Sequence, residues 1–192
     1  MKNSYLTDVL YRLEQVSRDV HDVFFNLNEE QIMWKEAEVK WSIGQCLEHL
    51  IRTDTAYFSQ VQSVLAGRYN RPRLSYIPFL GKIWGRLALK TVASKVRTPL
   101  NAPDMFYPNE EFNPSHIVHD YEVHVANLTQ LIRDTDHFNH KRIFFKSPMF
   151  KGIVYPLSDT LKLMANHHER HLNQAMNVYN AIHFPKMGLN DD

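Results

Sequence analysis

The chain has 192 residues, enough for one domain to bury roughly 70% of its unfolded surface without disulfides or metals. Hydrophobic residues make up 44% of it and charged residues 22%, as in ordinary globular proteins, and no run of 18 apolar residues exists that could span a membrane. One cysteine excludes an intrachain disulfide, and the first residues lack the apolar run of a signal peptide. We therefore expect a single cytoplasmic domain over residues 1–192.

The net charge of +1 conceals an uneven distribution. Residues 55–103 contain eight basic residues and no acidic one. The basic residues are Arg68, Arg71, Arg73, Lys82, Arg86, Lys90, Lys95 and Arg97. Such a segment needs a separate structural or functional explanation.

Residues 4–25 are predicted to form the first long helix, because apolar side chains recur there at intervals of three and four. His21 falls near the edge of this stripe, where we interpret it as a partly buried structural histidine. Asn28 then begins a short helical turn, and Gln31 is placed to cap it.

Residues 42–67 are predicted to form the second long helix. Ser42 and Gln45 have the spacing of a capping box, and Gly67 is suited to the position just after the helix end. The start and end of this helix are therefore well marked.

His49 lies on the flank of the apolar face of this second helix, with Gln45 and Thr53 one turn to either side. A histidine in such a place can be a structural residue or a metal ligand, and both interpretations remain open. Cys46 is close to His49 and can be an extra ligand or a small core residue. We favour the core residue.

Residues 68–112 interrupt the helical pattern, with an amphipathic helix predicted over 78–97. One interpretation is a lid or crossover helix that covers the other helices or a subunit interface. A second is a surface that lies on an anionic membrane. We expect no nucleic-acid binding, because no aromatic residues cluster among the basic ones and no known nucleic-acid module is present.

The third long helix is predicted to begin with Asn113 as its N-cap and Pro114 in its first turn. His116, Asp120 and His124 recur every four residues beside its apolar stripe and form a rival metal constellation. We interpret them as a solvated polar face. The connection after this helix contains apolar clusters that can pack on the helix ends or form short extended pieces.

The fourth long helix is predicted over residues 158–182. His167 and His171 are four residues apart on a face that is otherwise core-forming, so both imidazoles can reach one metal ion. Burying two imidazoles without partners costs several kcal/mol, and a shared metal satisfies both. The zincin motif is absent, because Leu172 stands where its second histidine belongs. A metal here needs at least one more ligand.

Four long helices, with residues 68–112 between the second and the third, predict an all-α fold. We expect an up-down-type four-helix bundle with an extra amphipathic helix inserted between helices two and three. No glutamate stands three residues before any histidine, which excludes the di-iron bundles. His49 together with His167 and His171 would suit zinc or nickel and leave a coordination position open.

Two stretches carry a resemblance to a known family. They read WSIGQCLEHL over residues 41–50 and, downstream, LSD at 157–159 followed by HHERHLNQ at 167–174. With the helix order, this pattern resembles the DinB/YfiT-like superfamily of metalloenzymes over nearly the whole chain. The resemblance implies an often dimeric four-helix bundle, with His49, His167 and His171 as the ligands of one metal ion.

Members of that family include thiol S-transferases, thiol-dependent isomerases and metal-dependent hydrolases. The resemblance thus implies an enzyme that activates a water or a low-molecular-weight thiol against a small electrophile. Gln45, Thr53 and Gln174 are each near a ligand and are predicted to orient the nucleophile or tune the ligands. No general base is evident, because Glu169 is directed away from the His171 face.

Two other interpretations remain. The chain can be a non-catalytic helical bundle that binds a metal, a small ligand or a partner through its basic excursion. It can also associate with a membrane surface through residues 78–97. The enzyme interpretation predicts a small-molecule substrate and, from the family, a homodimer.

Overall fold

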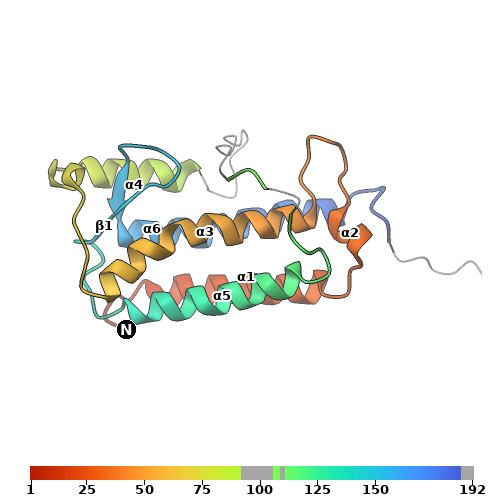
Figure 1. Ribbon diagram of the computed structural model, residues 1–192, viewed down its shortest axis with the longest axis horizontal. Coiled ribbons are helices and arrows are strands. Elements are labelled where there is room, and N and C mark those ends of the chain that lie inside the picture. The colour runs from red at the N-terminus through yellow and green to blue at the C-terminus, as the bar shows by residue number, and fades with distance from the viewer. Residues whose placement is uncertain (92–105, 109–110, 187–192) are drawn as a thin grey trace, which may run out of the picture.

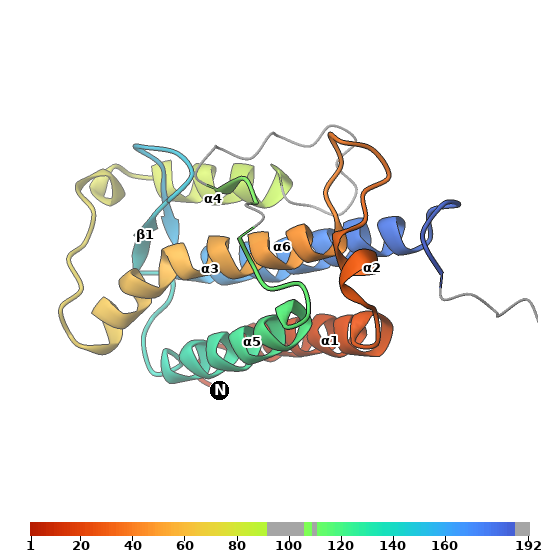
Figure 2. The same ribbon diagram turned by 45° about the vertical axis from the view of Figure 1, so that its right-hand side comes forward.

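The computed structural model describes residues 1–91, 106–108 and 111–186. Four long helices dominate it: α1 (Leu6–Phe24), α3 (Ile43–Leu65), α5 (Ile117–Asp134) and α6 (Leu157–Tyr179). They pack as two layers, α1 beside α5 and α3 beside α6 (Figures 1 and 2). The predicted all-α class is confirmed.

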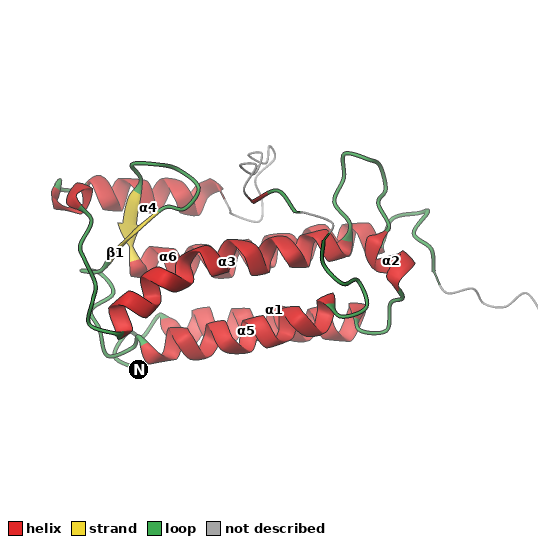
Figure 3. Cartoon of the chain, viewed as in Figure 1, coloured by secondary structure: helices red, strands yellow, loops and turns green. Residues whose placement is uncertain are grey.

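The shorter elements are α2 (Glu29–Met33), the 3₁₀ helix η1 (Arg73–Tyr76), α4 (Leu80–Thr91), β1 (Phe144–Lys146) and β2 (Val154–Pro156). β1 and β2 pair as an antiparallel hairpin, and among the described residues they are the only strands (Figure 3). α4 packs on β2 and α6, on the side of the α3–α6 layer away from α1 and α5 (Figure 2). It therefore covers one face of that layer.

Local sequence signals set the ends of α2 and α3. The Ser42 hydroxyl accepts a hydrogen bond from the Gln45 amide, and the Gln45 side chain accepts one from the Ser42 amide, both at 3.1 Å. Asn28 and Gln31 form the same reciprocal pair at 2.9 Å. Gly67 adopts a left-handed backbone conformation (φ 67°) just beyond α3. Both predicted caps and the predicted helix end are confirmed.

Contacts between helices show their relative directions. Between α1 and α6 the contacts Arg12–Glu169 and Phe24–Tyr179 advance in the same direction along both helices. Between α1 and α5 the contacts Glu14–Arg133 and His21–Glu122 advance in opposite directions. The contacts His49–His171 and Asp54–His168 do the same between α3 and α6. α6 thus runs with α1, while α3 and α5 both run against them. Strict up-down alternation is not kept between α3 and α5, because the long segment between them returns the chain to the end at which α3 began.

Three predicted boundaries were inaccurate. α5 begins at Ile117, later than predicted, because the Asn113 side chain accepts a hydrogen bond from the Ser115 amide (3.1 Å) and closes a turn instead of capping the helix. α6 ends at Tyr179 instead of residue 182. The predicted helix over 78–97 is observed as Leu80–Thr91, and residues 92–97 lie outside the described residues.

Two glycines let α4 approach its neighbours closely. A Cβ atom at Gly81 would lie 2.5 Å from the Phe144 ring, and one at Gly85 would overlap the Asp159 carboxylate. These positions fix which side of α4 faces the hairpin and α6. Among the described helices, none combines the length and apolar character needed to cross a bilayer.

Candidate metal centre

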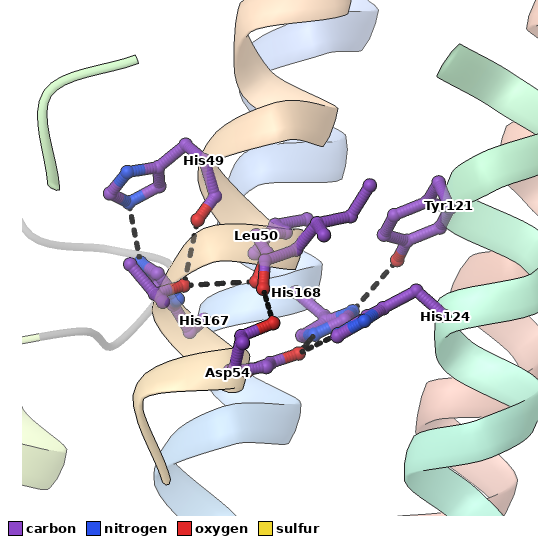
Figure 4. A network of polar contacts seen from close by, with 10 residues as sticks. His49, Leu50, Asp54, Tyr121, His124, His167 and His168 are labelled. Atoms are coloured by element: carbon purple, nitrogen blue, oxygen red, sulfur yellow. Dashed lines mark hydrogen bonds and ion pairs between the residues drawn. The ribbon is translucent and has the colours of Figure 1, made fainter. Parts of the chain in front are cut away.

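Three histidines converge between α3 and α6. One potential ligand atom each of His49, His167 and His171 lies within 4.8 Å of the others. His49 Nε2 is 3.2 Å from His167 Nε2 (Figure 4). His49 and His171 are buried and His167 is partly buried. Within the described residues, no other group of histidine, cysteine and acidic side chains meets the same criterion. The three histidines that the sequence singled out therefore come together.

The remaining nitrogens indicate which atoms are available to a metal. His49 Nδ1 donates a hydrogen bond to the carbonyl oxygen of Phe106 (2.6 Å), which leaves a lone pair on His49 Nε2. His171 Nδ1 is buried with no hydrogen-bond partner in the described part of the chain. The Trp41 ring stacks on His171, with centroids 5.5 Å apart. A buried nitrogen without a partner is costly, and a metal ion nearby would account for this arrangement of rings.

All three imidazoles favour the neutral state. Burial lowers the pKa of His49 to about 4, although its bond to Phe106 opposes the shift. Burial, and then the positive charge that His49 would carry, lowers the pKa of His167 to about 3. Burial followed by repulsion from the other two histidines lowers the pKa of His171 well below its ordinary value. Neutral imidazole is the form that binds metals, so the site is ready for a cation at neutral pH.

The geometry fits a single transition-metal ion. Zinc binds histidine nitrogen at about 2.0–2.1 Å, so two nitrogens at adjacent tetrahedral positions are about 3.3 Å apart. The distance of 3.2 Å between His49 Nε2 and His167 Nε2 is close to this value. Three imidazoles suit zinc, nickel and related ions, while calcium and magnesium prefer oxygen ligands.

A cavity of about 450 Å³ adjoins the three histidines. Its walls are formed by α3, α6, α4 and the hairpin loop over residues 147–150. Of the residues predicted to assist the ligands, Thr53 and Gln174 line this cavity, and the Thr53 hydroxyl donates to the His49 carbonyl oxygen (2.8 Å). Gln45 is not among the described lining residues, since its side-chain oxygen caps α3.

Behind the histidine cluster lies a buried polar network that sequence reasoning missed (Figure 4). Asp54 Oδ2 accepts hydrogen bonds from His168 Nε2 (2.7 Å) and His124 Nε2 (3.2 Å). The Tyr121 hydroxyl donates to His168 Nδ1 (2.7 Å). Burial alone would raise the pKa of Asp54, but the electrostatic interaction with the His168 imidazole and the hydrogen bonds from His124 and His168 outweigh burial and leave this pKa below its ordinary value. The sequence signal that could have predicted this network is Asp54, an acidic residue within the mostly apolar face of the helix predicted over residues 42–67.

This network corrects the prediction made for α5. His124 was expected on a solvated face, but it is buried, with its ring stacked on Phe58 at a centroid distance of 5.4 Å. His116 and Asp120 are exposed as expected. The rival metal constellation is not assembled among the described residues. The prediction for His124 was wrong because this side chain faces Asp54 on α3 and not solvent.

Two further residues lie as predicted. Glu169 receives two hydrogen bonds from Arg12, each 2.6 Å long, on the side of α6 that faces α1. It is therefore directed away from the histidine cluster. Cys46 is fully buried, and burial raises the pKa of its thiol, as expected for a core residue.

Comparison with known proteins identifies a family. The model of the DinB superfamily matches residues 12–175. The chain belongs to the DinB superfamily. No curated protein and no solved structure gives a significant match. The resemblance predicted from the sequence is confirmed, and a three-histidine cluster compatible with a metal is present in this DinB-superfamily chain.

Proposed function

We propose that this DinB-superfamily chain is a metal-dependent enzyme in which His49, His167 and His171 bind one zinc or nickel ion. The supporting observation is that three neutral imidazoles converge at the wall of a cavity of about 450 Å³. Structural zinc sites have four protein ligands, whereas three leave a position for a reactant. The cavity volume suits a small molecule.

The proposed reaction is hydrolysis of a small electrophile or its attack by a low-molecular-weight thiol. The metal, when bound, would lower the pKa of a water or thiol so that a nucleophile exists at neutral pH. Trp41 covers the histidines on one side and limits access of bulk water. Thr53 and Gln174 offer polar groups to a substrate in the cavity, and Gln45 supports the ligands indirectly by holding the start of α3.

Asp54 acts in this proposal as a positioning residue. It holds His168, the neighbour of His167 on α6, against α3 at the level of the ligands. It also binds His124 of α5, so one carboxylate links three helices. This arrangement fixes the separation of α3 and α6, on which the distance between His49 and His167 depends.

Several broader features belong to the same proposal. The four long helices would be the family's four-helix bundle, as a single domain over residues 1–192 in the cytoplasm. The functional unit would be a homodimer, as the family resemblance implies.

A second candidate function is non-catalytic binding of a metal or small ligand. It is favoured by the absence, among the described residues of the cavity wall, of a carboxylate that is free to act as a general base. Asp54, the carboxylate there, is held by two imidazoles. A hydrolase would then need the substrate or solvent to carry the proton.

A turnover screen separates the two functions. Zinc- and nickel-loaded protein is incubated with several thiols and with epoxide, activated-ester and alkyl-halide electrophiles, and product is measured by mass spectrometry. The enzyme proposal predicts turnover that disappears in His49→Ala and persists in His116→Ala, whose histidine is exposed just before the start of α5. Full metal binding without turnover in any combination would favour the non-catalytic function.

A further inference from the structure

The outward face of α4 carries a stripe of exposed apolar side chains. Phe79, just before the helix, is 74% exposed, Ile83 is 58% exposed and Leu87 is 49% exposed. Ile83 and Leu87 are four residues apart within α4 and so lie along one face, and Phe79 directly precedes the first turn of the helix. Tyr76 and Ile77 of the preceding segment are also exposed. Exposed apolar residues gathered in this way are typical of an interaction surface.

A basic stripe runs beside the apolar one. Lys82, Arg86 and Lys90 are exposed and are also four residues apart. No acidic residue occurs between positions 55 and 103 of the sequence. Asp159 of α6 lies against Gly85 and interacts with Arg86, so it offsets part of the charge of that residue. We call the two stripes together the α4 face.

The exposure of this face is fixed by the opposite side of the helix. Gly81 and Gly85 face the hairpin and α6 so closely that a Cβ atom would overlap Phe144 or Asp159. The helix cannot rotate to bury Ile83 without moving larger side chains into those positions. Phe79 also has a positive φ of 64°, which is strained for a bulky residue and places an aromatic ring in solvent.

We propose that the α4 face docks on an anionic lipid surface. Phosphate headgroups would bind Lys82, Arg86 and Lys90, while Phe79 and Ile83 enter the interfacial layer. A nucleic acid would satisfy the basic stripe but leave the apolar stripe in water. A second copy of the chain on the same face would bring two basic stripes together across a two-fold axis, which is unfavourable. Leu87 also lines the cavity, so docking places the cavity wall at the lipid surface.

The test is co-sedimentation of the full chain with vesicles of phosphatidylcholine alone or with about 30 mol% phosphatidylglycerol. We expect at least about tenfold more binding to the anionic vesicles, and most of this gain lost in about 0.5 M NaCl. Lys82→Gln with Lys90→Gln should weaken binding about 30-fold. Phe79→Asn with Ile83→Ser should weaken it about tenfold or more, and Asn tolerates the backbone at position 79.

The matched control is Tyr11→Ser with Phe25→Ser, which removes two exposed aromatic residues from the α1 region and should leave binding unchanged. Circular dichroism checks that every variant is folded. Equal recovery on both vesicle types, or equal binding by the α4-face variants and the control, overturns the proposal. So does a lipid-free dimer that the α4-face variants dissociate, or tighter binding to a DNA oligonucleotide than to the anionic vesicles.

Discussion

His49 Nε2 lies 3.2 Å from His167 Nε2, while His49 Nδ1 is committed to the carbonyl oxygen of Phe106. One proton on His167 could bridge the two nitrogens as a hydrogen bond. That proton would leave His171 Nδ1 still buried without a partner in the described residues. A metal ion gives all three rings a common partner, which is why we favour it over a purely structural cluster.

Replacing a ligand should abolish metal binding without unfolding the chain. His49→Ala is expected to lower bound metal from about one equivalent to less than about one tenth, because two imidazoles bind zinc far more weakly than three. Elemental analysis after gel filtration measures the ratio. His116→Ala, at an exposed residue just before α5, is the matched control and should keep its metal. Loss of metal in His124→Ala but not in His49→Ala would place the site at α5 instead.

The metal-free protein should lose stability as the pH falls from 7 to 5. The folded-state pKa values of about 4 for His49 and about 3 for His167 lie below the unfolded value, so the unfolded chain takes up more protons in this range. At pH 5 each such group can cost up to about 2 kcal/mol of unfolding free energy. Urea titrations at several pH values measure the effect. A stability that is flat or rises on acidification contradicts these shifts, and His49→Asn should reduce the slope.

Asp54→Asn should destabilise the chain by about 2–4 kcal/mol, because the buried His124 and His168 lose a charged acceptor that serves both. Tyr121→Phe removes one hydrogen bond and should cost only about 1 kcal/mol. Asp120→Asn, on the exposed face of α5, should stay within about 0.5 kcal/mol of the wild type. Urea unfolding measures all three, and an Asp54→Asn protein as stable as the Asp120→Asn control would contradict the network's structural role.

Gly81→Ala should loosen α4 even though alanine has the higher helix propensity. The gain of up to about 1 kcal/mol in propensity is outweighed by overlap with the Phe144 ring, for which overpacking costs about 1–3 kcal/mol. Limited proteolysis should cut the α4 region faster than in the wild type. Lys82→Ala, the next position and exposed, is the control. Slower cleavage in Gly81→Ala than in Lys82→Ala would show that α4 does not pack as described.

Sequence periodicity was sufficient for the long helices and for the pair His167 and His171, since both are properties of a single helix. The capping boxes at Asn28 and Ser42 were equally local. His124 was misassigned because a helical wheel gives the angle of a side chain about its own axis but not which neighbour it faces. The contact between His124 and Asp54 depends on the packing of α5 against α3, which the sequence of neither helix specifies by itself. The common direction of α3 and α5 depends likewise on the path of the chain between them.

The central claim is that the three histidines hold one metal ion, and elemental analysis of protein purified without a metal-affinity tag tests it most directly. The protein is incubated with zinc or nickel and freed of excess metal by gel filtration. The account predicts about one equivalent of transition metal per chain. Less than about one tenth of an equivalent, unchanged by added zinc or nickel, would contradict it.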